Sequence, residues 1–301
     1  MPDGMPTAAT LAIDSRCTLG EGITWWPARG ALLWTDIQAS RLWMHTPAGS
    51  ATRTWNLPDR LGSLAVCRSG ALLLGLAKGL FLATLDDTGP DLAVTPVVPV
   101  EPELPSTRIN DGRTDRAGNF VFGTMDDTEA APLGHFYQYS AAFGLRRLDL
   151  PGVTIANSIC FSLDGRTMYF CDSPARRILQ CDYDAASARV ANVRAFVQFA
   201  AHQGLPDGSV VDAEGCLWNA EWGAGVVRRY TPQGRLDREV AVPAKNPTCP
   251  GFAGAALDEI YITSARQAMT PEELERTPHA GGVYRASPAV RGVPDLVFEG
   301  Y

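Results

Sequence analysis

The segment AGNFVFGTM (117–125) shows a pattern that returns along the whole chain, a turn that carries Gly followed by a short apolar strand. Five other segments share it: RGALLWTD (29–36), SGALLLG (69–75), DGRTMYFCD (164–172), EGCLWNA (214–220) and LDEIYIT (257–263). With Gly30, Gly70, Gly118, Gly165, Gly215 and Leu257 as anchors, the intervals are 40, 48, 47, 50 and 42 residues. A repeat of this length built from strands is typical of a β-propeller.

The residues between the anchors fit further short strands. After Gly118, for example, GHFYQY (134–139) and LRRLDL (145–150) each form a run that ends near Gly, Pro or Asp. The 29 Gly and 22 Pro among 301 residues also favour many turns over long helices. Only TPEELER (270–276) predicts a helix, a short one capped by Thr270. We therefore expect an all-β fold, a six-bladed β-propeller that forms one domain over residues 1–301.

Composition and charge exclude several classes of partner. The chain has 26 Lys and Arg against 33 Asp and Glu, a net charge of −7, and no basic block that would bind a nucleic acid. The N-terminus lacks the charge and apolar run of a signal peptide, and no apolar window is long enough to span a membrane. The seven Cys form no CxxC pair, which favours buried free thiols. We expect a cytoplasmic protein that binds neither nucleic acid nor membrane.

Six equivalent positions lie at the start of the innermost strand of each repeat, eight or nine residues before the anchor: Glu21, Gly62, Asn110, Asn157, Asp207 and Cys249. In a propeller these positions surround one mouth of the central channel. Four of the six side chains carry carboxylate or carboxamide oxygens, which are costly to bury together without a cation. Such oxygens suit Ca²⁺, Mg²⁺ or Mn²⁺. The alternative is ordinary turn chemistry, since Asp-Gly and Asn-Asp-Gly are common in loops.

Other polar residues are expected near the same mouth. Arg108 lies two residues before Asn110, so both side chains should point to one side of a strand, where a guanidinium can orient ligand oxygens. A surface salt bridge is the alternative for Arg108. The next strand of each repeat returns to this mouth about 15 residues later, which places a second set near the rim: Asp36, Lys78, Asp127, Ser173, Trp222 and Arg266.

Four segments resemble, in order, the motifs of the senescence-marker-protein/gluconolactonase/luciferin-regenerating-enzyme-like family, which includes regucalcin. They are LGEG (19–22), RINDGRTDRAGNFVFGTM (108–125), IANSICFSLDG (155–165) and LPDGSVVDAEG (205–215). The segments TSAR (263–266) and GGVY (281–284) further resemble bacterial sugar-acid lactonases. The resemblance extends over essentially the whole chain.

The resemblance implies a six-bladed propeller with one divalent metal ion on Glu21, Asn157 and Asp207. It also implies that Arg108 and Asn110 bind the substrate and that Asp207 acts as acid and base. A family glutamate that contacts the substrate falls on Thr128 here, with Asp126, Asp127 and Glu129 beside it. The departure bears on the sugar specificity more than on the reaction. Asp127, expected at the rim from the strand spacing, is our third candidate for substrate binding beside Arg108 and Asn110.

The function expected from these features is the metal-dependent hydrolysis of a sugar lactone to the aldonic acid in sugar catabolism. Arabinono-, xylono- and gluconolactone are candidate substrates. Ca²⁺ is the first candidate ion, and Zn²⁺, Mn²⁺, Mg²⁺ and Fe²⁺ also fit. Two alternatives remain: a paraoxonase-like arylesterase or organophosphatase, and a calcium-binding propeller without activity. The sequence leaves open the native lactone, the metal, the oligomeric state and the roles of Thr128, Trp222 and Arg266.

Overall fold

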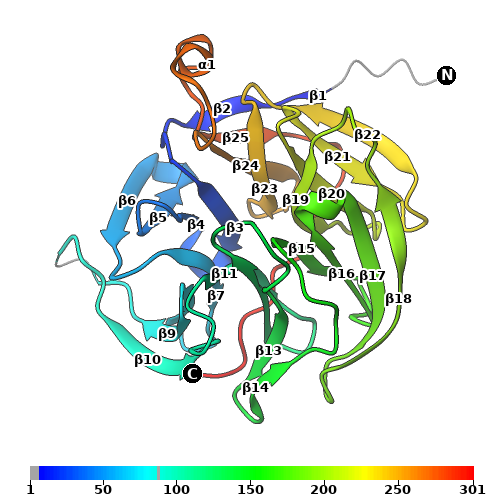
Figure 1. The fold of residues 1–301 in the computed structure, drawn as a ribbon. Coiled ribbons are helices and arrows are strands. Elements are labelled where there is room, and N and C mark those ends of the chain that lie inside the picture. The colour runs from blue at the N-terminus through cyan, green and yellow to red at the C-terminus, as the bar shows by residue number, and fades with distance from the viewer. Residues whose placement is uncertain (1–6, 87–88) are drawn as a thin grey trace.

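The protein is a ring of six β-sheets around a central axis, as the computed structural model shows for residues 7–86 and 89–301 (Figure 1). Each sheet contains four antiparallel strands, and the innermost strand of each contacts the innermost strands of both neighbouring sheets. This is the six-bladed β-propeller that the repeat predicts.

The first three blades contain, from the axis outward, β3 (Gly20–Trp26), β4 (Ala31–Asp36), β5 (Arg41–Thr46) and β6 (Ala51–Asn56); β7 (Leu61–Val66), β8 (Leu72–Leu76), β9 (Gly79–Ala83) and β10 (Val94–Pro99); and β11 (Thr107–Thr114), β12 (Phe120–Asp126), β13 (Phe136–Ser140) and β14 (Gly144–Arg147). The last three contain β15 (Ala156–Phe161), β16 (Thr167–Asp172), β17 (Arg177–Asp184) and β18 (Arg189–Gln198); β19 (Leu205–Val211), β20 (Leu217–Trp222), β21 (Val226–Tyr230) and β22 (Leu236–Ala241); and β23 (Asn246–Ala253), β24 (Glu259–Ala265), β25 (Val283–Ala286) and β2 (Thr10–Ile13).

The ring is closed by the start of the chain. Strand β2 pairs antiparallel with β25, so the last blade takes its outer strand from the N-terminal part and its other strands from the C-terminal part. The short strand β1 (Thr7–Ala8) adds parallel to β22 of the preceding blade. The last blade is thus completed by a strand that leads along the chain into β3 of the first blade, which links the two blades where the ring closes.

The anchors of the repeat occupy equivalent turns between the first and second strands of each blade. All six have left-handed backbone: φ is 56° at Gly30, 86° at Gly70, 81° at Gly118, 70° at Gly165, 77° at Gly215 and 51° at Leu257. Glycine suits this conformation because it has no Cβ to clash with the neighbouring carbonyl. Leu257 takes the same turn despite its side chain, which explains why the sixth repeat is hard to recognise by glycine alone.

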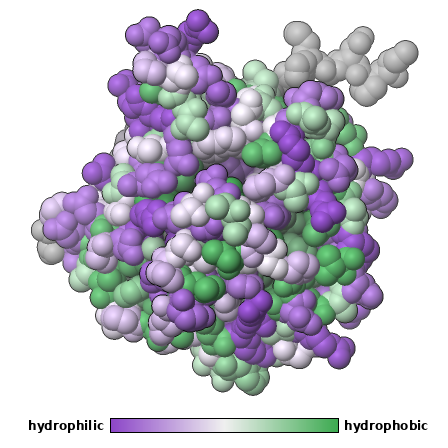
Figure 2. Space-filling model, viewed as in Figure 1, coloured by the Kyte–Doolittle hydropathy of each residue, from purple (hydrophilic) through white to green (hydrophobic). Residues whose placement is uncertain are grey.

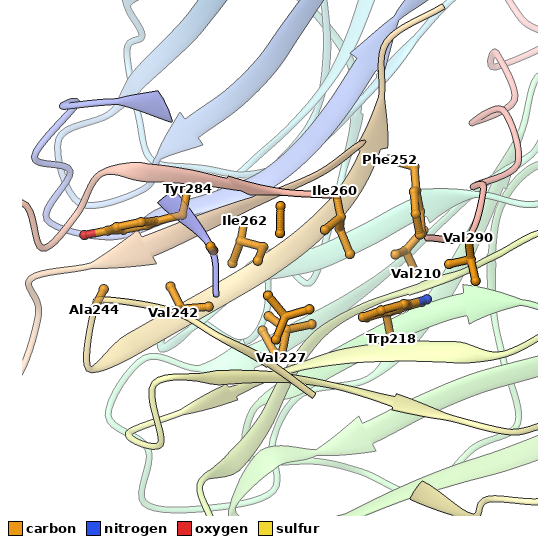
Figure 3. Packing of buried hydrophobic residues seen from close by; sticks show 14 residues of the cluster. Val210, Trp218, Val227, Val242, Ala244, Phe252, Ile260, Ile262, Tyr284 and Val290 are labelled. Atoms are coloured by element: carbon orange, nitrogen blue, oxygen red, sulfur yellow. The ribbon is translucent and has the colours of Figure 1, made fainter. Parts of the chain in front are cut away.

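The hydrophobic cores lie between the blades, one at each of the six interfaces. Figure 3 shows the core between the last two blades, where Trp218 and Val227 face Phe252 and Ile260. Because a neighbouring blade packs on each face, β4 is buried over its whole length. Inner strands therefore appear in the sequence as continuous apolar runs, while the outer strand β18 is mostly exposed.

The remaining elements are short. Helix α1 (Pro271–Arg276) begins with the expected cap: the Thr270 hydroxyl accepts from the Glu273 backbone N–H, and the Glu273 carboxylate accepts from the Thr270 N–H. Three 3-10 helices span Pro27–Arg29, Pro47–Gly49 and Ser173–Ala175. The α1 protrusion is mostly hydrophilic (Figure 2). All seven cysteines are buried and free, as predicted. Within residues 7–86 and 89–301, no helix is long and apolar enough to cross a membrane.

The C-terminal segment 287–301 crosses the end of the ring at which the innermost strands finish. It forms β-bridges to two blades, at Asp212 through Gly292 and at Cys67 through Phe298. At the axis the Asp295 carboxylate accepts from Arg113 Nη1 of β11 at 2.5 Å and from the Thr24 hydroxyl of β3 at 2.9 Å. Burial alone would lower the pKa of Arg113, but the Asp295 charge raises it. The segment thus covers the channel at this end and holds it with a partly buried ion pair.

The Asp295→Ala variant is expected to lose stability because it leaves the partly buried Arg113 guanidinium without its carboxylate. Breaking a fully buried pair from one side costs about 3 kcal/mol and an exposed one less than about 1 kcal/mol. For this partly buried pair we expect about 2 kcal/mol, which lowers the melting temperature by roughly 4 °C. Thermal unfolding followed by circular dichroism measures the change. Glu299→Ala is the matched control, since Glu299 lies on the same segment and pairs with Arg68 in solvent, where an ion pair contributes less than about 1 kcal/mol. Equal melting temperatures for the two variants would contradict the structural role of Asp295.

Candidate active site

A pocket of about 190 Å³ opens at the mouth where the innermost strands start. Its floor is polar and its walls are largely apolar. The residues that line it come from five of the six blades and the adjoining loops: Leu19, Glu21, Arg108, Asn110, Met125, Glu129, Ile155, Asn157, Ser173, Leu205, Pro206, Asp207, Trp222, Gln267 and Ala268. The pocket thus contains five of the six residues predicted as catalytic, substrate-binding or metal-binding.

The polar floor is aimed into the pocket by irregularities in the innermost strands. The pairing register shifts between Glu21 and Thr24 in β3, between Asn157 and Cys160 in β15, and within the other four innermost strands at corresponding places. A β-bulge turns a side chain away from its regular direction, and such bulges are common beside active sites. The residue after Asn157, Ser158, has left-handed backbone with φ 62°, and its hydroxyl donates to the Asp207 carbonyl at 2.6 Å. This bond ties two site strands together.

Glu21 and Asp207 face each other across the floor. Both line the same pocket, near enough for each charge to act on the other, and the Asp207 side chain is buried. Burial raises the pKa of Asp207, and the nearby charge of Glu21 raises it further. The pKa of Glu21 is raised in the same way, by burial and by the charge of Asp111. Two carboxyl groups in contact resist simultaneous ionisation unless a cation compensates them.

The donor set on the floor fits a divalent metal ion. Glu21 and Asp207 supply two negative charges, and the Asn157 carboxamide adds a neutral oxygen beside them in the same pocket. Hard cations such as Ca²⁺ prefer this combination of carboxylate and amide oxygens. In the described part of the chain, no group of three His, Cys, Asp and Glu side chains is arranged to hold a metal. The amide of Asn157 is the side chain beside the two carboxylates that can supply a third oxygen.

A chain of hydrogen bonds holds the amides of the floor. The Arg108 guanidinium is buried and donates through Nη1 to Asn110 Oδ1 at 2.8 Å. Asn110 Nδ2 donates to Asn157 Oδ1 at 3.2 Å and to the Ala156 carbonyl at 3.0 Å. Asn157 Nδ2 in turn donates to the Ser173 hydroxyl at 3.0 Å. These bonds fix which end of the Asn157 amide is the oxygen, and this oxygen is the one required for a metal ligand.

The other two ring positions, Gly62 and Cys249, contribute to packing and do not line the pocket. A Cβ on Gly62 would lie 2.4 Å from the Ile109 carbonyl oxygen, so the close approach of β7 and β11 requires glycine there. Cys249 packs in the core between the last and first blades, where burial raises the pKa of its thiol.

Of the six residues predicted at the rim, Ser173 and Trp222 line the pocket. Asp36 instead accepts from the backbone N–H groups of Thr18 and Leu19. The Lys78 ammonium donates to backbone carbonyls of residues 104 and 107. Arg266 is not among the lining residues, and its backbone N–H donates to the carbonyl of residue 18 at 3.1 Å.

The acidic residues at the end of β12 and in the loop that follows, Asp126, Asp127 and Glu129, lie in three different surroundings. Asp126 organises the loop, accepting from the Thr128 hydroxyl and from the backbone N–H groups of residues 128, 130 and 131. Asp127 lies outside the lining set, and both of its oxygens accept from arginines. Glu129, with left-handed backbone at φ 54°, is the acidic residue of this loop that lines the pocket. Thr128 is thus a loop-stabilising residue here, and Glu129 is the acidic group at the rim.

The sequence analysis did not predict most of the residues that form the walls of the pocket, although their spacing along the chain indicates several of them. Leu19, Ile155 and Leu205 each lie two residues before a ring position, as Arg108 does. The period of two that placed Arg108 would have placed them too. Gln267 and Ala268 come from the loop before α1, whose path over the mouth has no periodic signal.

The fold and this site together define a class of protein: a six-bladed propeller with an oxygen-lined pocket at one mouth of its axis. The model of the SMP-30/gluconolactonase/LRE-like family matches residues 19–266. The chain belongs to this family.

Individual relatives cover nearly the whole chain. An L-arabinolactonase of Azospirillum brasilense is 45% identical over 295 residues, which are 97% of this chain and 96% of that protein. A putative sugar lactone lactonase of Rhizobium meliloti is 33% identical and covers 97% of each chain. The solved structure of a regucalcin from Agrobacterium tumefaciens, described as a calcium-binding protein, matches with a TM-score of 0.91 at 31% identity over 98% of each chain.

Proposed function

We propose that the protein hydrolyses a sugar lactone, an aldonolactone of the arabinono-, xylono- or gluconolactone type, to the open aldonic acid. The observation that carries the proposal is the Glu21–Asp207 carboxyl pair beside Asn157 on the floor of a small pocket. The 45% identity to an L-arabinolactonase over nearly the full length supports the same reaction class. Arabinonolactone is therefore the first substrate to test.

Asp207 is the proposed acid and base of the reaction. Its carboxylate accepts a proton from the attacking water and returns one to the ring oxygen as the acyl–oxygen bond breaks. Proton transfer by a positioned group accelerates such a step by about 10²–10⁴-fold. Glu21, Asn157 and Asp207 would hold the divalent ion, which when bound polarises the lactone carbonyl as a Lewis acid. The relative described as calcium-binding makes Ca²⁺ the first ion to test.

Arg108 and Asn110 are the proposed substrate-binding residues. Two of the three guanidinium nitrogens of Arg108 are committed to Asp127, Ile109 and Asn110. Nη2 has no hydrogen-bond partner in the described chain, so it is the nitrogen that we assign to a lactone oxygen. Glu129 and Gln267 at the rim add polar groups, while Met125 and Trp222 can cover the apolar face of a sugar ring.

The size of the pocket favours a small substrate. Its volume of about 190 Å³ lies below the 300–1,000 Å³ or so that drug-sized ligands occupy. A five- or six-carbon lactone suits this space better than a bulky aryl phosphate. This argues for a sugar lactonase over the arylesterase alternative.

The test is acid release from a panel of sugar lactones by metal-stripped protein reloaded with single ions. We expect turnover of at least one pentono- or hexonolactone at a rate at least 100-fold above that of phenyl acetate. Faster hydrolysis of phenyl acetate would support the arylesterase instead. Metal-dependent stabilisation without turnover of any lactone would overturn the proposal and support a binding propeller.

A further inference from the structure

Two arginines and one aspartate form an ion cluster beside the pocket. Arg60 binds Asp127 with both ends of its guanidinium, Nη1 to Oδ1 at 2.8 Å and Nη2 to Oδ2 at 2.9 Å. Arg108 Nε donates to the same Oδ1 at 3.1 Å. Asp127 therefore joins two cations that come from different blades. We refer to Arg60, Asp127 and Arg108 as the clamp.

The repeat explains how the two arginines come together. Arg60 lies two residues before the ring position Gly62, as Arg108 lies two residues before Asn110. The two residues are thus equivalent positions in adjacent blades, at the mouth of the channel. Because Gly62 has no side chain and β7 lies close to β11, the second and third blades approach each other there. One carboxylate can then reach both guanidinium groups.

The clamp determines the charge that a ligand meets. Arg108 is the sole cationic side chain among the described residues that line the pocket, and it is 4% exposed. Asp127 supplies one negative charge that Arg108 shares with Arg60, and Arg108 Nη1 donates to the Asn110 carboxamide and the Ile109 carbonyl. Glu129 contributes a negative charge at the rim. The two arginines of the clamp are thus balanced by two carboxylates, Asp127 and Glu129, so a phosphate or carboxylate on the substrate would meet no net positive charge here.

We propose that Asp127, held by Arg60, is a positioning residue that keeps Arg108 oriented and charge-paired and so restricts the pocket to uncharged lactones. This inference rests on the proposed function and adds to it the class of lactone accepted. Without the Asp127 charge, two neighbouring guanidinium groups would face a common space with no anion between them. Such a pair is a binding site for phosphate, sulfate or carboxylate groups.

The decisive variant is Asp127→Asn, because an amide oxygen can still accept one hydrogen bond while the charge is lost. We expect KM for a neutral aldonolactone to rise about tenfold with kcat changed less than threefold. Arg108 loses the charged contact at Nε that orients its free Nη2, but its Nη1 bonds to Ile109 and Asn110 still hold the floor. The ratio of kcat/KM for a 6-phosphorylated aldonolactone to that for the unphosphorylated compound should rise at least tenfold. Calorimetry should show sulfate binding to the variant, with chloride at equal ionic strength as the reference, and none to the wild type.

A second variant keeps the test valid if Asp127→Asn folds poorly. Arg60→Gln leaves Asp127 paired with Arg108 and removes only the outer, partly exposed arginine. We expect KM to rise about threefold without a gain in sulfate binding. An unchanged KM would overturn the role of Arg60 as the residue that holds Asp127.

Asp182→Asn is the matched control, since it removes an aspartate that pairs with Arg194 in solvent on the outer strands. Its KM and substrate ratio should stay within twofold of wild type. The clamp is overturned if Asp127→Asn matches this control in KM, substrate ratio and sulfate binding. If the wild type hydrolyses no lactone, the proposed function fails, and the sulfate measurement still decides the clamp.

Discussion

The Asp207→Asn variant should lose lactone hydrolysis by at least about 10³-fold while keeping its fold. The amide cannot accept the proton of the attacking water, which by itself removes about 10²–10⁴-fold. It also withdraws one of the two negative charges that would hold the ion. Initial rates of acid release at saturating metal measure the loss, and the unchanged far-ultraviolet circular dichroism spectrum shows that the blades remain formed.

Stability separates this role from a structural one. Because Asp207 and Glu21 are like-charged neighbours, removing one charge should leave the melting temperature in chelator unchanged or raise it. Asp164→Asn is the matched control: it lies in another Asp-Gly step, in an exposed turn where it accepts from Ser162 and Arg166. This control should retain full activity. Turnover above a tenth of wild type in Asp207→Asn would remove Asp207 from the mechanism.

The sequence predicts the floor of the site because the floor follows the repeat. Asn110, Asn157 and Asp207 lie eight residues before their anchors and Glu21 lies nine, and each blade repeats a similar backbone path. Identical backbone geometry brings equivalent residues to equivalent places around an axis. The spacing of the repeat therefore predicted both the fold and the presence of these four side chains in one pocket. The single domain, the cytoplasmic location and the roles assigned to the residues stay predictions.

The rim could not be predicted in the same way, because it depends on hydrogen bonds that have no period. Asp36 and Lys78 occupy the expected ends of their strands but satisfy nearby backbone groups, which is a common use of polar side chains at strand ends. Asp127 faces Arg60 as well as Arg108 because two blades approach at Gly62. Glu129 reaches the pocket because Asp126 folds the loop around its own carboxylate. The contacts of Asp36, Lys78 and Asp127 join residues distant in sequence, whereas those of Asp126 lie within one loop that has no periodic pattern.

Removal of the metal should abolish hydrolysis and lower stability together. With the ion gone, the Glu21 and Asp207 carboxyls are left against each other in a buried floor, where one of them must take up a proton. A ligand present at 100 times its dissociation constant stabilises the folded state by about 2.7 kcal/mol. Chelation should therefore lower the melting temperature by roughly 5 °C.

The measurement pairs thermal unfolding with acid release, in EDTA and after re-addition of Ca²⁺, Mn²⁺, Mg²⁺ or Zn²⁺. Because two carboxylates and an amide form the floor, Ca²⁺, Mn²⁺ or Mg²⁺ should restore both signals. Glu21→Gln should show neither the metal-dependent rise in melting temperature nor the activity, whereas Asp164→Asn should show both. The proposal of a metal would be overturned if the stripped protein kept full activity and its melting temperature did not change when ions were added. The carboxyl pair would then work without a metal, with Asp207 acting as a base alone.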